Sequence, residues 1–71
     1  MRSIADLRAG ESGVILSVTG PHALRLMAMG FTPDTPVALR MRAPAGDPLL
    51  IALRGYSLII RRRDAAEIHL K

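Results

Sequence analysis

Two histidines and six acidic side chains are the residues of this chain that could ligate a metal ion or transfer a proton. His22 and His69 are 47 positions apart, and neither is followed two, three or four residues later by another ligand. A tight zinc or iron site needs three or four converging nitrogen, oxygen or sulfur ligands, so we expect no metal site and no cofactor. We interpret His22 as partly buried at the start of a helix and His69 as exposed on an edge strand.

The hydroxyl side chains lack the setting that nucleophilic catalysis requires. No serine, threonine or tyrosine forms a recognisable motif with a histidine or a carboxylate. The six glycines are isolated rather than grouped in a phosphate-binding loop. A chain this short also rarely forms a water-excluding pocket in addition to a core. The sequence therefore predicts a protein that is not an enzyme and has no catalytic residues.

The methionines could suggest a soft-metal site, but their positions favour packing. Met29 and Met41 fall on predicted core faces, where methionine commonly fills irregular gaps. Met27 lies off the helix face that carries Leu26 and Met29, so we expect it to be exposed and available to a protein partner.

Arginine dominates the charge of the chain, whose formal net charge is +4. A basic surface attracts nucleic acid, lipid headgroups or acidic protein patches. Arg61-Arg62-Arg63 forms a run, and we expect Arg40, Arg42 and Arg54 on outward strand faces. A nucleic-acid-binding small barrel is therefore an alternative function, but single-strand binders use aromatic stacking platforms, and here only Tyr56 is available.

Short elements separated by glycine and proline must position these side chains. Val37, Leu39 and Met41 alternate with smaller or charged residues, which is typical of a half-buried strand. The predicted elements are a helical turn in 3–10, strands at 13–19, 37–42, 49–54, 57–61 and 67–71, a helix at 21–29 and a second helical turn at 63–66.

The residues Gly55-Tyr56 predict a type II′ hairpin between two strands. That loop would pair Leu53 with Leu58 and Ile51 with Ile60 on the inward face. Leu50 and Ile59 then point outward on neighbouring strands. An exposed apolar pair of this kind, rimmed by arginine, is typical of a protein interface.

Length and composition limit the fold class. The chain has 71 residues, of which 49% are hydrophobic, and it has no cysteine, which fits a reducing compartment. No signal peptide is evident, and the longest apolar run, Leu49–Leu53, is far shorter than the roughly 20 residues that span a membrane. We expect one domain, residues 1–71, mainly β, built as a small five-stranded barrel with one short inserted helix and closed to avoid exposed edges.

Several segments in order resemble the ferrous iron transport protein A family, or FeoA-like domains. Arg25-Leu26-Met27-Ala28-Met29-Gly30-Phe31 is similar to the helix signature of that family, and Ala43–Pro48 resembles its A-P-x-G-D-P loop. Leu7 and Gly10 match its opening, and the segment from Gly55 to Ile68 follows its closing pattern, with Asp64 in place of the commoner glutamate. In the turn Thr32–Thr35, Asp34 stands where the family usually has the glycine that a type II turn favours, so we expect a type I turn here.

The resemblance implies an SH3-like barrel in the bacterial cytoplasm that acts as an accessory to FeoB, a ferrous iron transporter with a GTPase domain. The chain would then reach the membrane only through this partner, with no nucleic acid expected. Similar barrels follow a DNA-binding region in metal-dependent repressors, so a metal-responsive regulatory domain is a second alternative. Because Met1 opens the domain directly, we favour a stand-alone accessory, and we leave the oligomeric state open, a weak homo-oligomer included. The residues that we expect to contact the partner are Arg25, Met27, Leu50, Tyr56 and Ile59.

Overall fold

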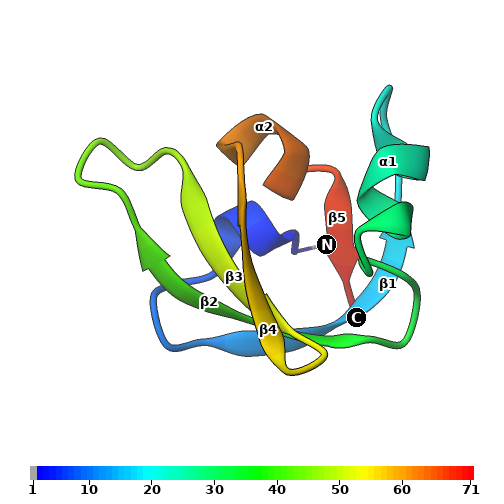
Figure 1. The fold of residues 1–71 in the computed structure, drawn as a ribbon, viewed down its shortest axis with the longest axis horizontal. Coiled ribbons are helices and arrows are strands. Elements are labelled where there is room, and N and C mark those ends of the chain that lie inside the picture. Colours follow the sequence, from blue (N-terminus) through cyan, green and yellow to red (C-terminus); the bar gives the residue numbers. More distant parts are fainter. Residues whose placement is uncertain (1) are drawn as a thin grey trace.

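A single antiparallel sheet forms most of the structure, which is a computed structural model that describes residues 2–71 (Figure 1). Met1, which the sequence analysis used, lies outside the described residues. The elements in chain order are the 3₁₀ helix η1 (Ile4–Asp6), β1 (Ser12–Val18), α1 (Ala23–Ala28), β2 (Pro36–Arg42), β3 (Leu49–Leu53), β4 (Tyr56–Ile60), α2 (Arg62–Ala65) and β5 (Ile68–Leu70). The predicted mainly β class with five strands is confirmed, and α2 is a second short helix.

The strands lie in the order β4-β3-β2-β1-β5, and the sheet curls around the core. β1 joins its two halves: Ser12–Val14 pair with β2, and Ile15–Val18 pair with β5 after a change of register between Ile15 and Ser17. Among the described residues, β4 and β5 end this order and share no ladder. The barrel closure that we predicted is therefore not made by hydrogen bonds between these two strands.

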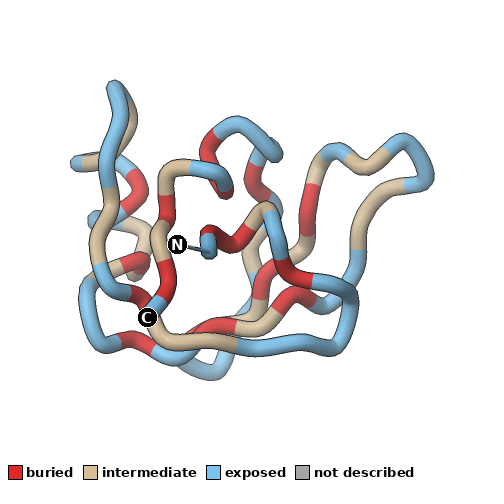
Figure 2. The backbone as a smooth tube through the Cα atoms, turned by 180° about the vertical axis from the view of Figure 1, so that it is seen from behind, coloured by how far each residue is buried: buried red, intermediate tan, exposed pale blue. Residues whose placement is uncertain are grey.

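Apolar side chains from every strand fill the inside of the curled sheet. Figure 2 shows buried positions in every strand, in η1 and in both α-helices. Without cysteine, this packing is the main source of stability. The buried apolar residues are Ile4, Leu7, Ile15, Leu26, Phe31, Val37, Leu39, Leu49, Ile51, Leu53, Ile60, Ala65, Ile68 and Leu70.

A β-bulge in β2 corrects one prediction. Leu39 pairs with Ile51, but Met41 pairs with Leu50, so Arg40 is an extra residue without a partner. The alternation therefore slips by one residue, and Met41, predicted in the core, is 57% exposed.

Arg42, predicted to face outward, turns inward for the same reason. Its guanidinium donates hydrogen bonds to the backbone oxygens of Ala5 and Leu7, at 2.6 and 2.7 Å. The bulge thus allows one arginine to hold η1 and the turn after it against the end of the sheet.

The β3–β4 hairpin turns at Arg54-Gly55, not at Gly55-Tyr56. Both turn residues have positive φ, 49° and 83°, which is the type I′ conformation rather than the predicted type II′. Ile51 consequently pairs with Leu58, Leu49 with Ile60, and Leu50 with Ile59. This is a shift of two residues from the predicted register, and an even shift preserves the faces, so the predicted inward set is still correct.

Asp34 also keeps a positive φ, of 68°, so the predicted change to a type I turn is wrong. Aspartate tolerates this left-handed conformation better than most residues. The turn closes with a hydrogen bond from the Thr35 amide to the Thr32 oxygen at 3.2 Å. It is held to β1 and to the end of the chain: the Asp34 amide donates to the oxygen of Ile15 at 2.7 Å, and the Lys71 ammonium contacts the Asp34 carboxylate.

We expect Gly30→Ala to destabilise the protein more than Gly46→Ala. Both glycines have positive φ. A Cβ added at Gly30 would lie 2.7 Å from Tyr56 Oη, whereas a Cβ added at Gly46 would have no neighbouring heavy atom within 4 Å. Gly46→Ala should therefore cost about 1–2 kcal/mol from backbone strain alone, and Gly30→Ala about 2–4 kcal/mol. Urea unfolding of the two variants measures the difference, and equal losses would contradict the close approach of Tyr56.

Asp6 should make stability depend on pH. Hydrogen bonds from the Ser3 amide, at 2.9 Å, and the Ser3 hydroxyl hold the pKa of the Asp6 carboxyl below its ordinary value, with the amide the main cause. A carboxyl with a lowered pKa stabilises the fold above its unfolded pKa, near 3.8, and loses that contribution as pH falls through the folded pKa. Thermal unfolding should show Asp6→Asn less stable than the parent chain at pH 7, with the gap closing in strong acid. A gap that is unchanged in acid would contradict the assignment.

Candidate protein-binding surface

An open apolar groove lies on the outer face of β2, β3 and β4. Its volume is about 230 Å³, and Ile59, at 68%, is more exposed than Met41, the other exposed large apolar side chain in its lining. Ile59 stands directly opposite Leu50 in the ladder, a pairing that the predicted register, two residues away, did not contain. We name this the β-face groove; its lining residues are Met41, Arg42, Ala43, Pro44, Pro48, Leu49, Leu50 and Ile59.

The groove exists because of two local features of the backbone. The bulge at Arg40 turns Met41 outward, beside Leu50. The loop of residues 43–48, which projects from the body of the molecule in Figure 1, adds Pro44 and Pro48. Sequence reasoning missed Met41 because strict alternation places it inside, and no residue type in β2 indicates a bulge.

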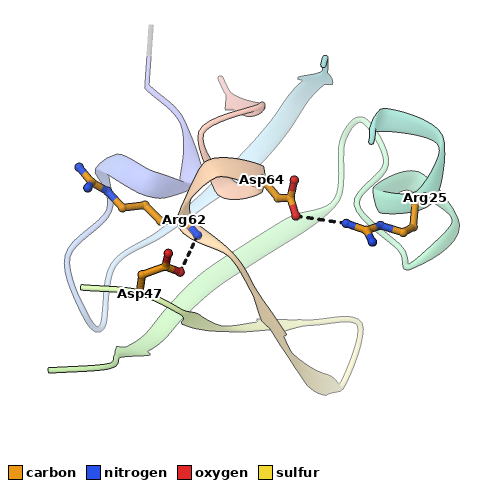
Figure 3. Close-up of polar contacts among 4 residues, drawn as sticks. All are labelled: Arg25, Asp47, Arg62 and Asp64. Carbon is orange, nitrogen blue, oxygen red and sulfur yellow. Dashed lines mark hydrogen bonds and ion pairs between the residues drawn. The ribbon is translucent and has the colours of Figure 1, made fainter. Parts of the chain in front are cut away.

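Loop 43–48 is attached to α2 by a capping hydrogen bond. Arg61, the residue before α2, makes no side-chain cap, and the Asp47 carboxylate instead accepts the amide of Arg62 at 2.9 Å (Figure 3). A carboxylate at the start of a helix satisfies a free donor and matches the helix dipole. The rim of the β-face groove is therefore anchored to a second element.

A second hollow separates α1 from β4 and the start of α2. It has a volume of about 260 Å³, and we name it the α1–β4 groove. Ile59 lines both grooves, so they meet at this residue. The lining residues are Arg25, Leu26, Met29, Ile59, Ile60, Arg61 and Asp64.

Two polar contacts hold the walls of the α1–β4 groove. Arg25 Nη2 lies 3.2 Å from Asp64 Oδ2, where the aspartate side chain is 8% exposed and the arginine side chain 61% exposed (Figure 3). At the other end, Tyr56 Oη donates to the backbone oxygen of Met29 at 2.5 Å. α1 is thus tied both to α2 and to the β3–β4 hairpin.

Four of the five predicted partner-binding residues adjoin the two grooves. Leu50 and Ile59 line the first, Arg25 and Ile59 line the second, and the Tyr56 hydroxyl donates to the backbone of Met29, which lines the second. Met27 is exposed on α1, as expected, but lines neither groove. Leu24, which the sequence analysis did not single out, is the most exposed large apolar residue, at 84%. Its position off the Leu26 and Met29 face could have revealed it.

Two of the arginines expected on outward faces have internal partners. Arg42 binds backbone oxygens, as described above, and Arg54 donates to the oxygen of Gly30 and to the hydroxyls of Thr32 and Thr35. These bonds also hold Arg54 in its positive-φ turn conformation. The outward basic surface is therefore smaller than the sequence suggested.

Within residues 2–71, no group of three histidine, cysteine, aspartate or glutamate side chains could hold a metal ion. His69 lies on the edge strand β5, but it is half-buried rather than exposed. Thr19 Oγ1 donates to Glu67 Oε1 at 2.7 Å and lies 2.8 Å from His69 Nε2. The helices of this part of the chain are all too short or too polar to cross a membrane.

Residues 2–71 match the FeoA domain family over their whole length. The chain belongs to that family. This confirms the resemblance drawn from the helix signature and from the Ala43–Pro48 loop.

Three relatives illustrate the similarity. The chain is 30% identical over 70 residues to an Fe²⁺ transport protein A/FeoB fusion protein of Porphyromonas gingivalis; the match covers 96% of this chain but 8% of the fusion protein. The FeoA protein of Chlorobium tepidum is 30% identical with a TM-score of 0.87, over 97% of this chain and 68% of that one. FeoA of Stenotrophomonas maltophilia, an SH3 domain protein complexed with zinc, is 25% identical with a TM-score of 0.88, over 100% and 91% of the two chains.

We expect Arg25→Met to destabilise the FeoA domain by about 1–2 kcal/mol, because the buried Asp64 carboxylate then loses its cation. Asp64→Asn should restore part of the loss in the double variant, since an amide tolerates burial without a charged partner. A double-mutant cycle by denaturant unfolding measures the coupling. Additive effects of the two substitutions would show that the pair contributes no interaction energy.

Proposed function

We propose that this chain is a cytoplasmic, non-enzymatic accessory of bacterial ferrous iron uptake that docks on a FeoB-type transporter with a GTPase domain and modulates it. The observation that carries the proposal is the fusion protein of Porphyromonas gingivalis, in which a homologous segment and a FeoB transporter are parts of one chain. Fusion keeps two modules at a high effective concentration, which favours partners that work in contact. The separate chain would reach the same arrangement by binding.

The exposed surface supports docking through side chains. Met41, Ile59 and Tyr56 are large, exposed and carried by a sheet rather than by a mobile loop. Apolar and aromatic side chains at the centre of a patch, with arginine at its rim, are enriched in protein interfaces. Arg25 and Arg61 form such a rim beside Ile59.

The nucleic-acid alternative is less well supported. Arg42 and Arg54, two of the arginines on which it depended, are held by hydrogen bonds within the chain. Tyr56, the single tyrosine, uses its hydroxyl to hold α1. A metal-responsive role would need ligands beyond those that residues 2–71 bring together.

We expect Ile59→Asp to weaken binding to the FeoB transporter of the same organism at least tenfold, because the carboxylate would be desolvated at the centre of the interface. Leu50→Asp should act in the same direction. Met27→Asp reports whether the exposed side of α1 also makes contact. Binding of the purified chain to detergent-solubilised transporter at near-physiological salt measures each effect.

Leu24→Asp is the matched control, because Leu24 is exposed and apolar but lines neither groove. Thermal unfolding must show that each variant remains folded. If the unsubstituted chain does not bind the transporter and binds nucleic acid with a steep salt dependence instead, docking is wrong and the nucleic-acid alternative replaces it.

A further inference from the structure

We propose that the free edge of β4 pairs, strand to strand, with an extended acidic segment of the transporter. This inference rests on the proposed association with a FeoB-type protein and specifies how that association is made. It assigns the main contact to backbone groups of β4, with the α1–β4 groove receiving the part of the segment that lies beside Ile59 and Arg61. Such strand addition gives affinity through main-chain hydrogen bonds and specificity through alternate side chains.

The hairpin register shows which backbone groups are free. In a two-residue hairpin the residues that flank the turn form a hydrogen-bonded pair, and such pairs then alternate with non-hydrogen-bonded ones. Leu53 and Tyr56 flank the turn, so Ser57 and Ile59 have amides and oxygens that point away from β3. No turn, loop or interelement backbone bond of residues 2–71 involves either residue. β4 therefore presents two free donors and two free acceptors along one edge.

The space beside this edge is open. The α1–β4 groove runs between β4 and the helix, and its volume of about 260 Å³ is not filled by any described side chain. The Tyr56 hydroxyl ties α1 to the hairpin end of β4, and the helix contacts α2 through Arg25 at the other end. These ties position α1 as the far wall of a groove beside Ile59 and Ile60, the last two residues of β4, while Ser57 lies nearer the hairpin turn and outside the groove lining.

Charge selects an acidic occupant. Arg25, with a side chain 61% exposed, and the exposed Arg61 line the α1–β4 groove. The single carboxylate in its wall, Asp64, is 8% exposed and already paired. Because Asp64 pairs with Arg25, the charge of Arg61 remains unmatched in the groove wall, and an acidic segment would meet it, which steers association and stabilises the complex.

The same charges disfavour a second copy of this chain as the occupant. Antiparallel pairing of two β4 edges would bring Arg61 of each copy toward the turn residue Arg54 of the other. Each copy also carries a formal net charge of +4. Like charges placed opposite one another on paired strands are destabilising.

Ser57→Pro tests the edge without removing a side chain that contacts the partner. Proline removes the outward amide of Ser57, which β3 does not use, and proline is tolerated on edge strands. Ser57→Ala is the matched control, since it alters the side chain and keeps the amide. With detergent-solubilised transporter, we expect Ser57→Pro to bind at least tenfold more weakly than the parent chain and Ser57→Ala to bind like it.

A charge-reversal variant and amide hydrogen exchange supply two independent readouts. Arg61→Glu should weaken binding about tenfold, whereas Arg8→Glu, the same change in the exposed turn before β1, should leave it nearly unchanged. Hydrogen exchange of the parent chain should slow at Ser57 and Ile59 when the transporter is added. This last measurement needs no variant and therefore does not depend on how well Ser57→Pro folds.

The outcomes separate this inference from the proposed function. Equal binding by the parent, Ser57→Pro and Ser57→Ala chains, with no slowed exchange at β4, would overturn strand addition and leave docking intact. Absence of binding by the parent chain would overturn both. A dimer of the chain alone that Ser57→Pro dissociates would show that the edge takes a second copy, which overturns the acidic segment as its occupant.

Discussion

The single extra residue in β2 is the constraint on which much of this small fold depends. A regular strand would send Met41 into a core that Leu39 and Ile51 already fill, and would leave Arg42 in solvent. The bulge at Arg40 exchanges the two faces for the last residues of the strand. Arg42 then satisfies two backbone oxygens near η1, and Met41 opens the β-face groove. One backbone irregularity thus both closes the core and creates an apolar surface.

Polar side chains tie distant segments of this chain together, as disulfides do in secreted domains of this size. Asp47 caps α2, Tyr56 and Arg54 hold the end of α1 to the hairpin, and Arg25 pairs with Asp64. Each of these contacts joins segments that are at least fifteen residues apart. Such contacts restrain the short helices, which have too few residues to be stable by themselves. The cost is that several of the arginines are not free to bind ligands.

The same ties give the candidate surface its rigidity. α1 and β4 face each other across a groove because their ends are joined, and Ile59 lies where this groove meets the apolar face of the sheet. A partner that binds here would not have to order a loop first, which lowers the entropic cost of association. In Porphyromonas gingivalis, a segment homologous to this chain and a FeoB transporter are parts of one chain.

The periodicity of the sequence by itself determined the strands, the inward set Leu53, Ile51, Leu58 and Ile60, and the outward orientation of Leu50 and Ile59. These features follow from side-chain alternation, which an even shift of register leaves unchanged. The ordered motifs determined the family. The turn at Arg54-Gly55, the positive φ of Asp34 and the bulge at Arg40 were decided by the tertiary structure. In each case contacts with distant residues, such as Thr32 and Thr35 for Arg54 or Ala5 and Leu7 for Arg42, outweigh a local preference of about 1 kcal/mol. A free strand edge and a groove are likewise properties of packed elements, so no local pattern of residues can reveal them.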